Sequence, residues 1–130
     1  MDNLNQGTLT IEVVQDKENK KIELVWKGKS VDLKPDVFLL PYYDKVIAEA
    51  KNTDSSVDIN FYHLIYMNSS TINSIIYFIK KLIAENIHSK VIYNKNLKWQ
   101  ELNFSTLKIF VSENGLFDIE ERKQEWQISR

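Results

Sequence analysis

Cysteine is absent from this chain of 130 residues, and it contains only three glycines and two prolines. Without cysteine the chain has no disulfide, no thiolate nucleophile and no cysteine-ligated metal. The three isolated glycines, Gly7, Gly28 and Gly115, cannot build a dinucleotide-binding fingerprint or a phosphate-binding loop. These absences exclude thiol enzymes and the glycine-rich classes of nucleotide-binding enzyme.

Neither sign of charge dominates, and no apolar run is long. Seventeen basic and eighteen acidic residues give a net charge of −1, whereas nucleic-acid binders normally carry a basic excess. The lysines within residues 17–29 are mixed with acidic residues, which predicts a solvated sheet edge. The apolar runs are too short to span a bilayer, and residues 1–9 show no secretory signal. We therefore expect a cytoplasmic protein without nucleic-acid or membrane partners.

Length and composition predict one domain over residues 1–130, with a core over about 8–120 and a charged tail over 121–130. Apolar residues make up 43% of the chain, which is enough for a core without metals or disulfides. Trp126, in the tail, is free to dock on the domain, on a second copy or nowhere.

Hydrophobic periodicity predicts strands alternating with helices. Gly28 is expected in a turn after the second strand, and Pro41 in the first turn of the first helix. That helix has an apolar stripe made of Leu39, Tyr43, Val46, Ile47 and Ala50. The predicted strands are 8–15, 20–27, 57–67 and 88–94, the predicted helices are 38–51, the stretch after residue 71 and 97–110 with a break near 103, and a short apolar segment follows at 116–119.

Residues 57–86 form the most informative segment, because an apolar strand passes through the polar bend Asn68–Thr71 directly into an amphipathic helix. The continuous apolar run at residues 64–67 predicts a strand that is covered on both faces. The bend residues are helix-capping types, which places the hydroxyl of Ser69 on an exposed helix N-terminus where a phosphate is tolerated. In most proteins such a bend is only a helix cap. The apolar stripe of the helix consists of Ile72, Ile75, Ile76, Ile79, Leu82 and Ile83.

The strand, bend and helix resemble the phosphorylation segment of anti-sigma-factor-antagonist (STAS) domains, and the order of elements is similar over about residues 8–120. In STAS domains an Asp-Ser-Ser/Thr-Gly-Leu bend follows the strand, and its first serine is modified. Here Asn68 replaces the usual Asp, and Thr71 and Ile72 replace Gly-Leu. The run Tyr66–Ser70 is closer to a variant branch of bacterial regulatory phosphoproteins, in which the partner can be an enzyme such as a diguanylate cyclase.

The resemblance implies a single α/β domain with a central mixed sheet of four to five strands and three to four packed helices. It implies a non-catalytic phosphoprotein of the anti-sigma-factor-antagonist type, acting in bacterial signal transduction and transcription regulation. An anti-sigma-factor-like serine kinase would phosphorylate Ser69, or Ser70 as the fallback, and a metal-dependent serine phosphatase would reverse the reaction. No cofactor or metal is implied for the chain itself. The implied partner-binding residues are Asn68, Ser69, Ser70, Thr71, Ile72 and Tyr77.

Two alternatives to the anti-sigma-factor-antagonist role stay open. One is a regulator of a partner enzyme such as a diguanylate cyclase. The other is an unmodified scaffold or oligomerisation module, in which the bend is a helix cap and the binding surface lies elsewhere.

The residues provide no pattern typical of an active site. Neither histidine lies in a metal-ligand spacing: His63 is expected to be partly buried and hydrogen-bonded in the central strand, and His88 to be on the surface. Ser69 lacks the glycine flanks of a nucleophile elbow. Nothing in the sequence fixes the geometry of the acidic pairs Asp54/Asp58 and Glu120/Glu121. We therefore predict that the chain is not an enzyme. Tyr77 and Phe78 do not both fit the apolar stripe, so one of them is expected to be an exposed interface anchor.

Overall fold

The computed structural model describes residues 1–111 and 115–123, so the predicted contacts of Trp126 lie outside the described residues. The helices are α1 (Asp36–Thr53), α2 (Ser69–Ala84), α3 (Lys98–Phe104) and the 3₁₀-helix η1 (Ser105–Phe110). The strands are β1 (Leu4–Gln6), β2 (Leu9–Asp16), β3 (Lys21–Ser30), β4 (Ser56–Asn60), β5 (Leu64–Met67), β6 (Ser89–Asn94) and β7 (Phe117–Arg122).

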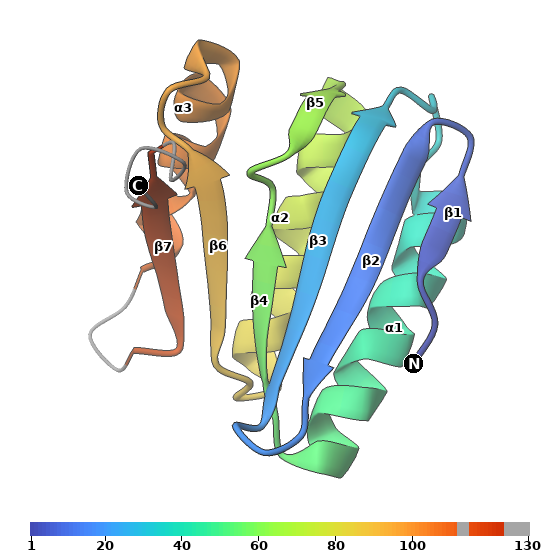
Figure 1. Ribbon diagram of the computed structural model, residues 1–130, viewed down its shortest axis with the longest axis vertical. Coiled ribbons are helices and arrows are strands. Elements are labelled where there is room, and N and C mark those ends of the chain that lie inside the picture. The colour runs from blue at the N-terminus through green and yellow to red at the C-terminus, as the bar shows by residue number, and fades with distance from the viewer. Residues whose placement is uncertain (112–114, 124–130) are drawn as a thin grey trace, which may run out of the picture.

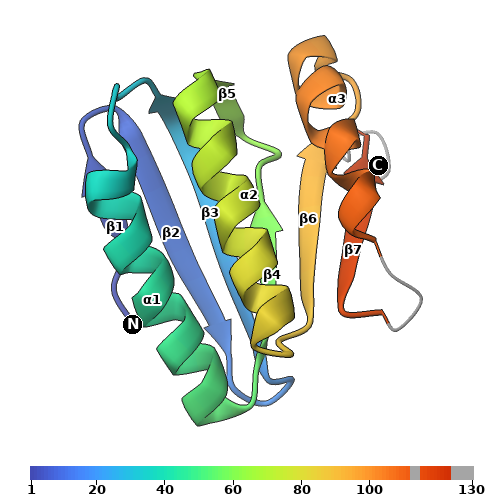
Figure 2. The same ribbon diagram turned by 180° about the vertical axis from the view of Figure 1, so that it is seen from behind.

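One mixed seven-stranded sheet forms the centre of the domain, in the order β1-β2-β3-β4-β6-β7, with β5 pairing with β3 beyond the end of β4. The β1, β2 and β3 pairings are antiparallel, and all later pairings are parallel. Helices α1 and α2 cover one face of this sheet (Figure 1 and Figure 2). The predicted α/β class, mixed sheet and packed helices are confirmed, although the described part of the chain has seven strands rather than four to five.

The core lies between this sheet and the two long helices. On β3, Ile22, Leu24 and Trp26 are fully buried, because they point to the helix-covered face. The stripe predicted for α1 is confirmed, and Tyr42 joins it. Pro41, however, lies in the second turn rather than the first. The reason is that Pro35 occupies the N-cap position with φ −66°, so the helix begins at Asp36.

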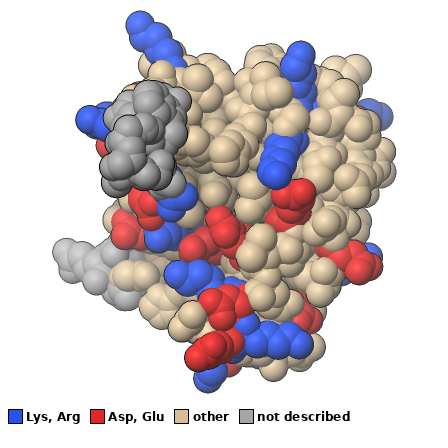
Figure 3. All heavy atoms as spheres, viewed as in Figure 1, with Lys and Arg blue, Asp and Glu red and all other residues tan. Residues whose placement is uncertain are grey.

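The other face of the sheet is open and charged (Figure 3). Across it, Lys27 pairs with Glu12 at 2.7 Å and Lys90 pairs with Glu120 at 2.9 Å. The prediction that the hairpin lysines line a sheet edge is wrong, because Lys21, Lys27 and Lys29 lie on β3, which is between β2 and β4. The short strand β1 has no counterpart in the predicted elements.

The predicted strand over residues 57–67 is in fact two strands, separated by a turn at residues 61–63. The Phe61 carbonyl accepts the N–H of Leu64 at 3.0 Å, which closes the turn. The carbonyls of Phe61 and Leu64 also accept hydrogen bonds from the buried Gln100 side chain at 2.7 and 3.0 Å. The same side chain accepts the N–H of Asn94 at 2.7 Å. Gln100 therefore joins α3, β6 and the strand break, and it fixes where β5 and the following bend begin.

This break overturns two further expectations. His63 lies in the turn and is exposed rather than buried in a central strand. Ile65 and Tyr66 on β5 are exposed, so this strand is not covered on both faces. The reason is that β5 lies at the end of the sheet, where it pairs only with the last residues of β3.

Gly28 lies inside β3 rather than in a turn after it. Its φ is +83°, and an added Cβ would lie 2.0 Å from the carbonyl oxygen of Thr8. The register of β3 against β5 shifts between Gly28 and Lys29, which marks a bulge or irregularity in that pairing. The predicted helix over residues 97–110 changes to a 3₁₀-helix after Phe104, close to the expected break. None of the helices in the described ranges is long and apolar enough to cross a membrane.

Candidate functional site

The bend between β5 and α2 lies at the edge of the sheet where the parallel strands end, which Figure 1 shows at the top. Asn68 is the N-cap of α2, with extended backbone at φ −89° and ψ 174°. Its Oδ1 accepts the backbone N–H of Thr71 at 3.0 Å and the Thr71 hydroxyl at 2.8 Å. The cap predicted from the polar bend is therefore supplied by Asn68, and Ser69 is the first residue of the helix.

The two serines of the bend differ in exposure. Ser69 is exposed to solvent, whereas Ser70 is half-buried. Ser69 therefore lies at the surface, as a site of phosphorylation would have to. Ser70 instead lines a pocket of about 380 Å³ with residues 33–37 and Asn73.

The buried side chain of Thr71 connects the bend to the end of β3. Its side chain is 0% exposed, and its hydroxyl lies 2.7 Å from that of Ser30 at the end of β3. One turn further along, the hydroxyl of Ser74 donates to that of Tyr43 at 3.2 Å. Burial raises the pKa of Tyr43, so the Tyr43 hydroxyl stays neutral. Thr71 offers no surface to a partner in this conformation, although it stands among the residues predicted to bind one.

The two neighbouring aromatic residues of α2 differ in exposure. Phe78 is fully buried and stacks on Tyr43, with ring centroids 4.1 Å apart. Tyr77 is 42% exposed, so one residue of this aromatic pair is exposed as expected. The Lys81 ammonium lies 5.7 Å from its ring centroid. The partner-binding role of Tyr77 stays a prediction.

The apolar stripe predicted for α2 is buried to different degrees. Three of its residues, Ile75, Ile79 and Leu82, are fully buried, while Ile72, Ile76 and Ile83 are half-buried.

Exposed apolar side chains flank the bend on both sides. Leu33 and Val37, which follow β3, are 85% and 74% exposed and line the pocket beside Ser70. On the other side, Ile65 and Tyr66 of β5 are exposed. Sequence reasoning missed the segment at residues 33–37; the available signal was an apolar pair around Pro35 in an otherwise polar stretch. Clustered exposed apolar residues are typical of a protein-binding surface.

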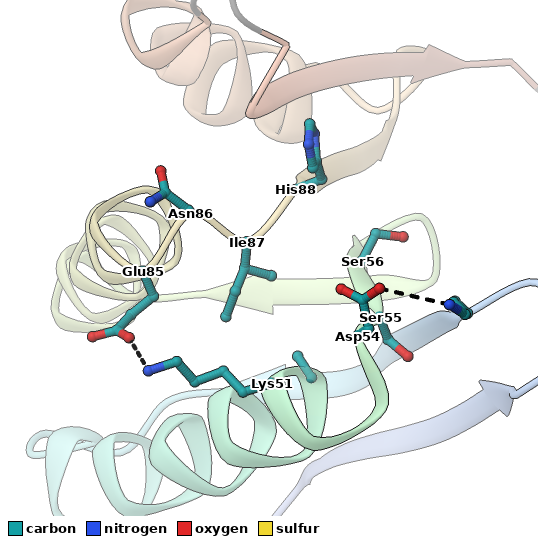
Figure 4. A pocket seen from close by; sticks show the side chains of 10 residues that line it. Lys51, Asp54, Ser55, Ser56, Glu85, Asn86, Ile87 and His88 are labelled. Carbon is teal, nitrogen blue, oxygen red and sulfur yellow. Dashed lines mark ion pairs between the residues drawn. The ribbon is translucent and has the colours of Figure 1, made fainter.

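A second pocket of about 400 Å³ lies at the opposite end of the domain, where α1 and α2 end (Figure 4). Its charges are paired: Lys51 with Glu85 and, at 3.6 Å, Lys20 with Asp54. His88 lies at its rim, is exposed as predicted, and its Nδ1 is 3.1 Å from the carbonyl oxygen of Gly115. The four charged side chains named here thus form two ion pairs across this pocket.

The two carboxylates of each acidic pair named from the sequence lie in different surroundings. Asp54 is at the end of α1, whereas Asp58 is on the open face of the sheet, where burial raises its pKa despite Lys21 at 3.7 Å. Glu120 and Glu121 are neighbours on a strand, so they point to opposite faces, and each is held by its own cations. Within residues 1–111 and 115–123, no group of three or more potential metal ligands occurs.

The fold matches solved structures, although no family model and no curated protein sequence matches the chain. The domain is similar to SiaC of Pseudomonas aeruginosa, with a TM-score of 0.65 and 14% identity over 95% of this chain and 100% of that chain. A second match, with a TM-score of 0.63 and 12% identity, is to a chain in the crystal structure of the diguanylate cyclase SiaD in complex with its activator SiaC. It covers 95% of this chain and 100% of that chain.

Apo-SiaC from the same organism matches with a TM-score of 0.59 and 14% identity, over 92% of this chain and 99% of that chain. At these identities the similarity establishes a shared fold. The α/β domain described here thus has the architecture of SiaC over nearly its whole length.

Proposed function

We propose that this chain is a non-catalytic regulatory protein that binds a diguanylate cyclase through the surface around the Asn68–Ile72 bend, and that phosphorylation of Ser69 switches this binding. A serine kinase and a metal-dependent serine phosphatase would set the phosphorylation state. ATP would be a substrate of the kinase, and this chain would be the phosphate acceptor.

The observation that carries the proposal is the exposed hydroxyl of Ser69 on a bend whose fold-determining contacts are made by its neighbours. Asn68 caps the helix and Thr71 joins it to β3, so modification of Ser69 disrupts neither contact. The shared fold with an activator of a diguanylate cyclase supports this class of partner over an anti-sigma factor. The exposed apolar residues beside the bend supply a surface for such a partner.

The proposed switch is electrostatic. A phosphate adds a charge of about −1.5 to −2 at neutral pH. On Ser69 it would lie beside the positive end of α2, so the folded domain tolerates it. In a desolvated contact with a partner, the same charge costs about 2–5 kcal/mol, which corresponds to about 30- to several-thousand-fold in affinity.

The test uses the serine kinase and the diguanylate cyclase encoded nearest the gene. Mass spectrometry after incubation with the kinase and ATP is expected to place phosphate on Ser69. Cyclase stimulation should persist with Ser69→Ala in the presence of the kinase, and it should be weak with Ser69→Asp. Asn52→Asp is the matched control, because it adds a carboxylate to an exposed residue of α1 that lies outside the proposed surface.

Three outcomes would redirect the proposal. Phosphate on Ser70 alone would move the switch to the pocket beside residues 33–37. No phosphate on either serine, together with no effect on the cyclase, would favour an unmodified scaffold. Phosphorylation without any effect on the cyclase would favour the anti-sigma-factor pathway.

A further inference from the structure

The side-chain amide of Asn68 holds two segments at once. Its Oδ1 accepts the Thr71 backbone N–H and hydroxyl, while its Nδ2 donates to the backbone carbonyl of Asp32 at 2.8 Å. The orientation of the amide follows from its partners. A backbone N–H can only donate and a carbonyl can only accept, so the oxygen must face α2 and the nitrogen must face Asp32.

Asp32 belongs to the loop of residues 31–35, which joins β3 to α1. Within this loop the backbone N–H of Lys34 donates to the Asp32 carboxylate at 3.0 Å. The loop presents Val31 and Leu33, both exposed, beside the bend. The backbone N–H of Asn68 also donates to the carbonyl of Ser30 at 3.0 Å, where the loop begins.

We propose that Asn68 is a positioning residue that couples the bend to this loop, so that Ser69 and the exposed side chains of the loop form one binding surface. Its oxygen orders the first turn of α2 and its nitrogen orders the loop. The use of this surface for a partner rests on the proposed function; the coupling itself does not.

Replacing Asn68 with aspartate would separate the two halves of the contact. Asp and Asn are about equally good N-caps, so the new carboxylate retains an acceptor for Thr71. It has no N–H to give to the Asp32 carbonyl, and it places a carboxylate oxygen against a carbonyl oxygen. Asn68→Asp is therefore expected to leave the helix capped and to release the loop.

The experiment measures backbone amide exchange with solvent by NMR in the full chain. In Asn68→Asp, the Lys34 amide is expected to exchange about two- to twelvefold faster, the factor that corresponds to one net hydrogen bond. The Thr71 amide should stay within about twofold of wild type, because its acceptor is kept. Asn68→Ala, which removes both contacts, should accelerate exchange at both amides.

Asn52→Asp is the matched control, since it makes the same chemical change at an exposed residue of α1 that lies outside the pocket beside Ser70. It should leave Lys34 exchange unchanged. Unchanged exchange of the Lys34 amide in Asn68→Asp would overturn the coupling, as would equal acceleration in the Asn52→Asp control. The measurement needs neither kinase nor cyclase, so the coupling can be confirmed even if the proposed function is wrong. Conversely, an absent coupling would not contradict the proposed function.

Discussion

Replacing Gln100 with leucine tests how the bend is held in place. Gln100 is 0% exposed, and its amide contacts the carbonyls of Phe61 and Leu64 and the N–H of Asn94. Leucine has a similar size and helix propensity, so the main loss is of three hydrogen bonds. Each buried polar group left without a partner costs about 1–3 kcal/mol. The Phe61 carbonyl keeps the N–H of Leu64 at 3.0 Å, so the groups that lose the most are the Leu64 carbonyl and the Asn94 N–H. For two such groups we expect a loss of about 2–6 kcal/mol, a large part of a typical stability of about 5–15 kcal/mol.

Urea denaturation followed by circular dichroism measures this loss from the midpoint and slope. Asn103→Leu is the control, because Asn103 is an exposed amide on the same helix; its change should stay within about 0.5 kcal/mol. A loss below about 1 kcal/mol in Gln100→Leu, with an unchanged slope, would refute the reasoning. It would mean that the carbonyls at the strand break find water when the amide is removed.

Three further changes test other parts of the structure. Gly28→Ala should destabilise the fold by several kcal/mol in a thermal melt, because its Cβ would lie 2.0 Å from a backbone oxygen; Gly7→Ala, also at positive φ but in open space, should cost only about 1–2 kcal/mol, and equal losses would count against the steric argument. The pKa of Glu121 is lowered to about 2, chiefly by hydrogen bonds from two lysines and a tyrosine hydroxyl. Because this pKa is lower in the folded state than in the unfolded chain, the ionised carboxylate stabilises the fold above about pH 4.5, and this contribution is lost as the pH falls toward 2. In urea titrations at several pH values, the stability difference between wild type and Glu121→Gln should therefore narrow over that range. A constant difference would contradict this. Thr71→Val should cost about 1–3 kcal/mol in urea denaturation through the loss of its buried hydroxyl, whereas Ser69→Ala should be close to neutral.

The sequence predicts the fold well wherever a side chain's surroundings follow from periodicity. The stripe of α1 and half of that of α2 are buried as expected, because spacings of three and four place these residues on one helix face. The alternation in β3 is equally clear, since its helix-facing residues are apolar and its other residues are mostly charged. These local patterns suffice for the α/β class.

Features that depend on distant partners are not visible in the sequence. The break between β4 and β5 is stabilised by Gln100, which is about 40 residues further along the chain, and nothing in the run from Phe61 to Met67 indicates it. The position of Gly28 inside a strand depends on the close approach of Thr8. Periodicity describes one element at a time, whereas these features arise from contacts between elements.

The candidate site shows the same division. The polar bend before an amphipathic helix predicts an exposed Ser69, and the structure exposes it. The loop of residues 31–35 lies beside the bend only because β3 and β5 are neighbours in the sheet. Asn68 satisfies the first turn of α2 on one side and the Asp32 carbonyl on the other. Its amide and the Thr71 hydroxyl carry these contacts, so the phosphorylation proposed for Ser69 would leave them in place. Such a modification would change the charge of the surface while the domain beneath it keeps its structure.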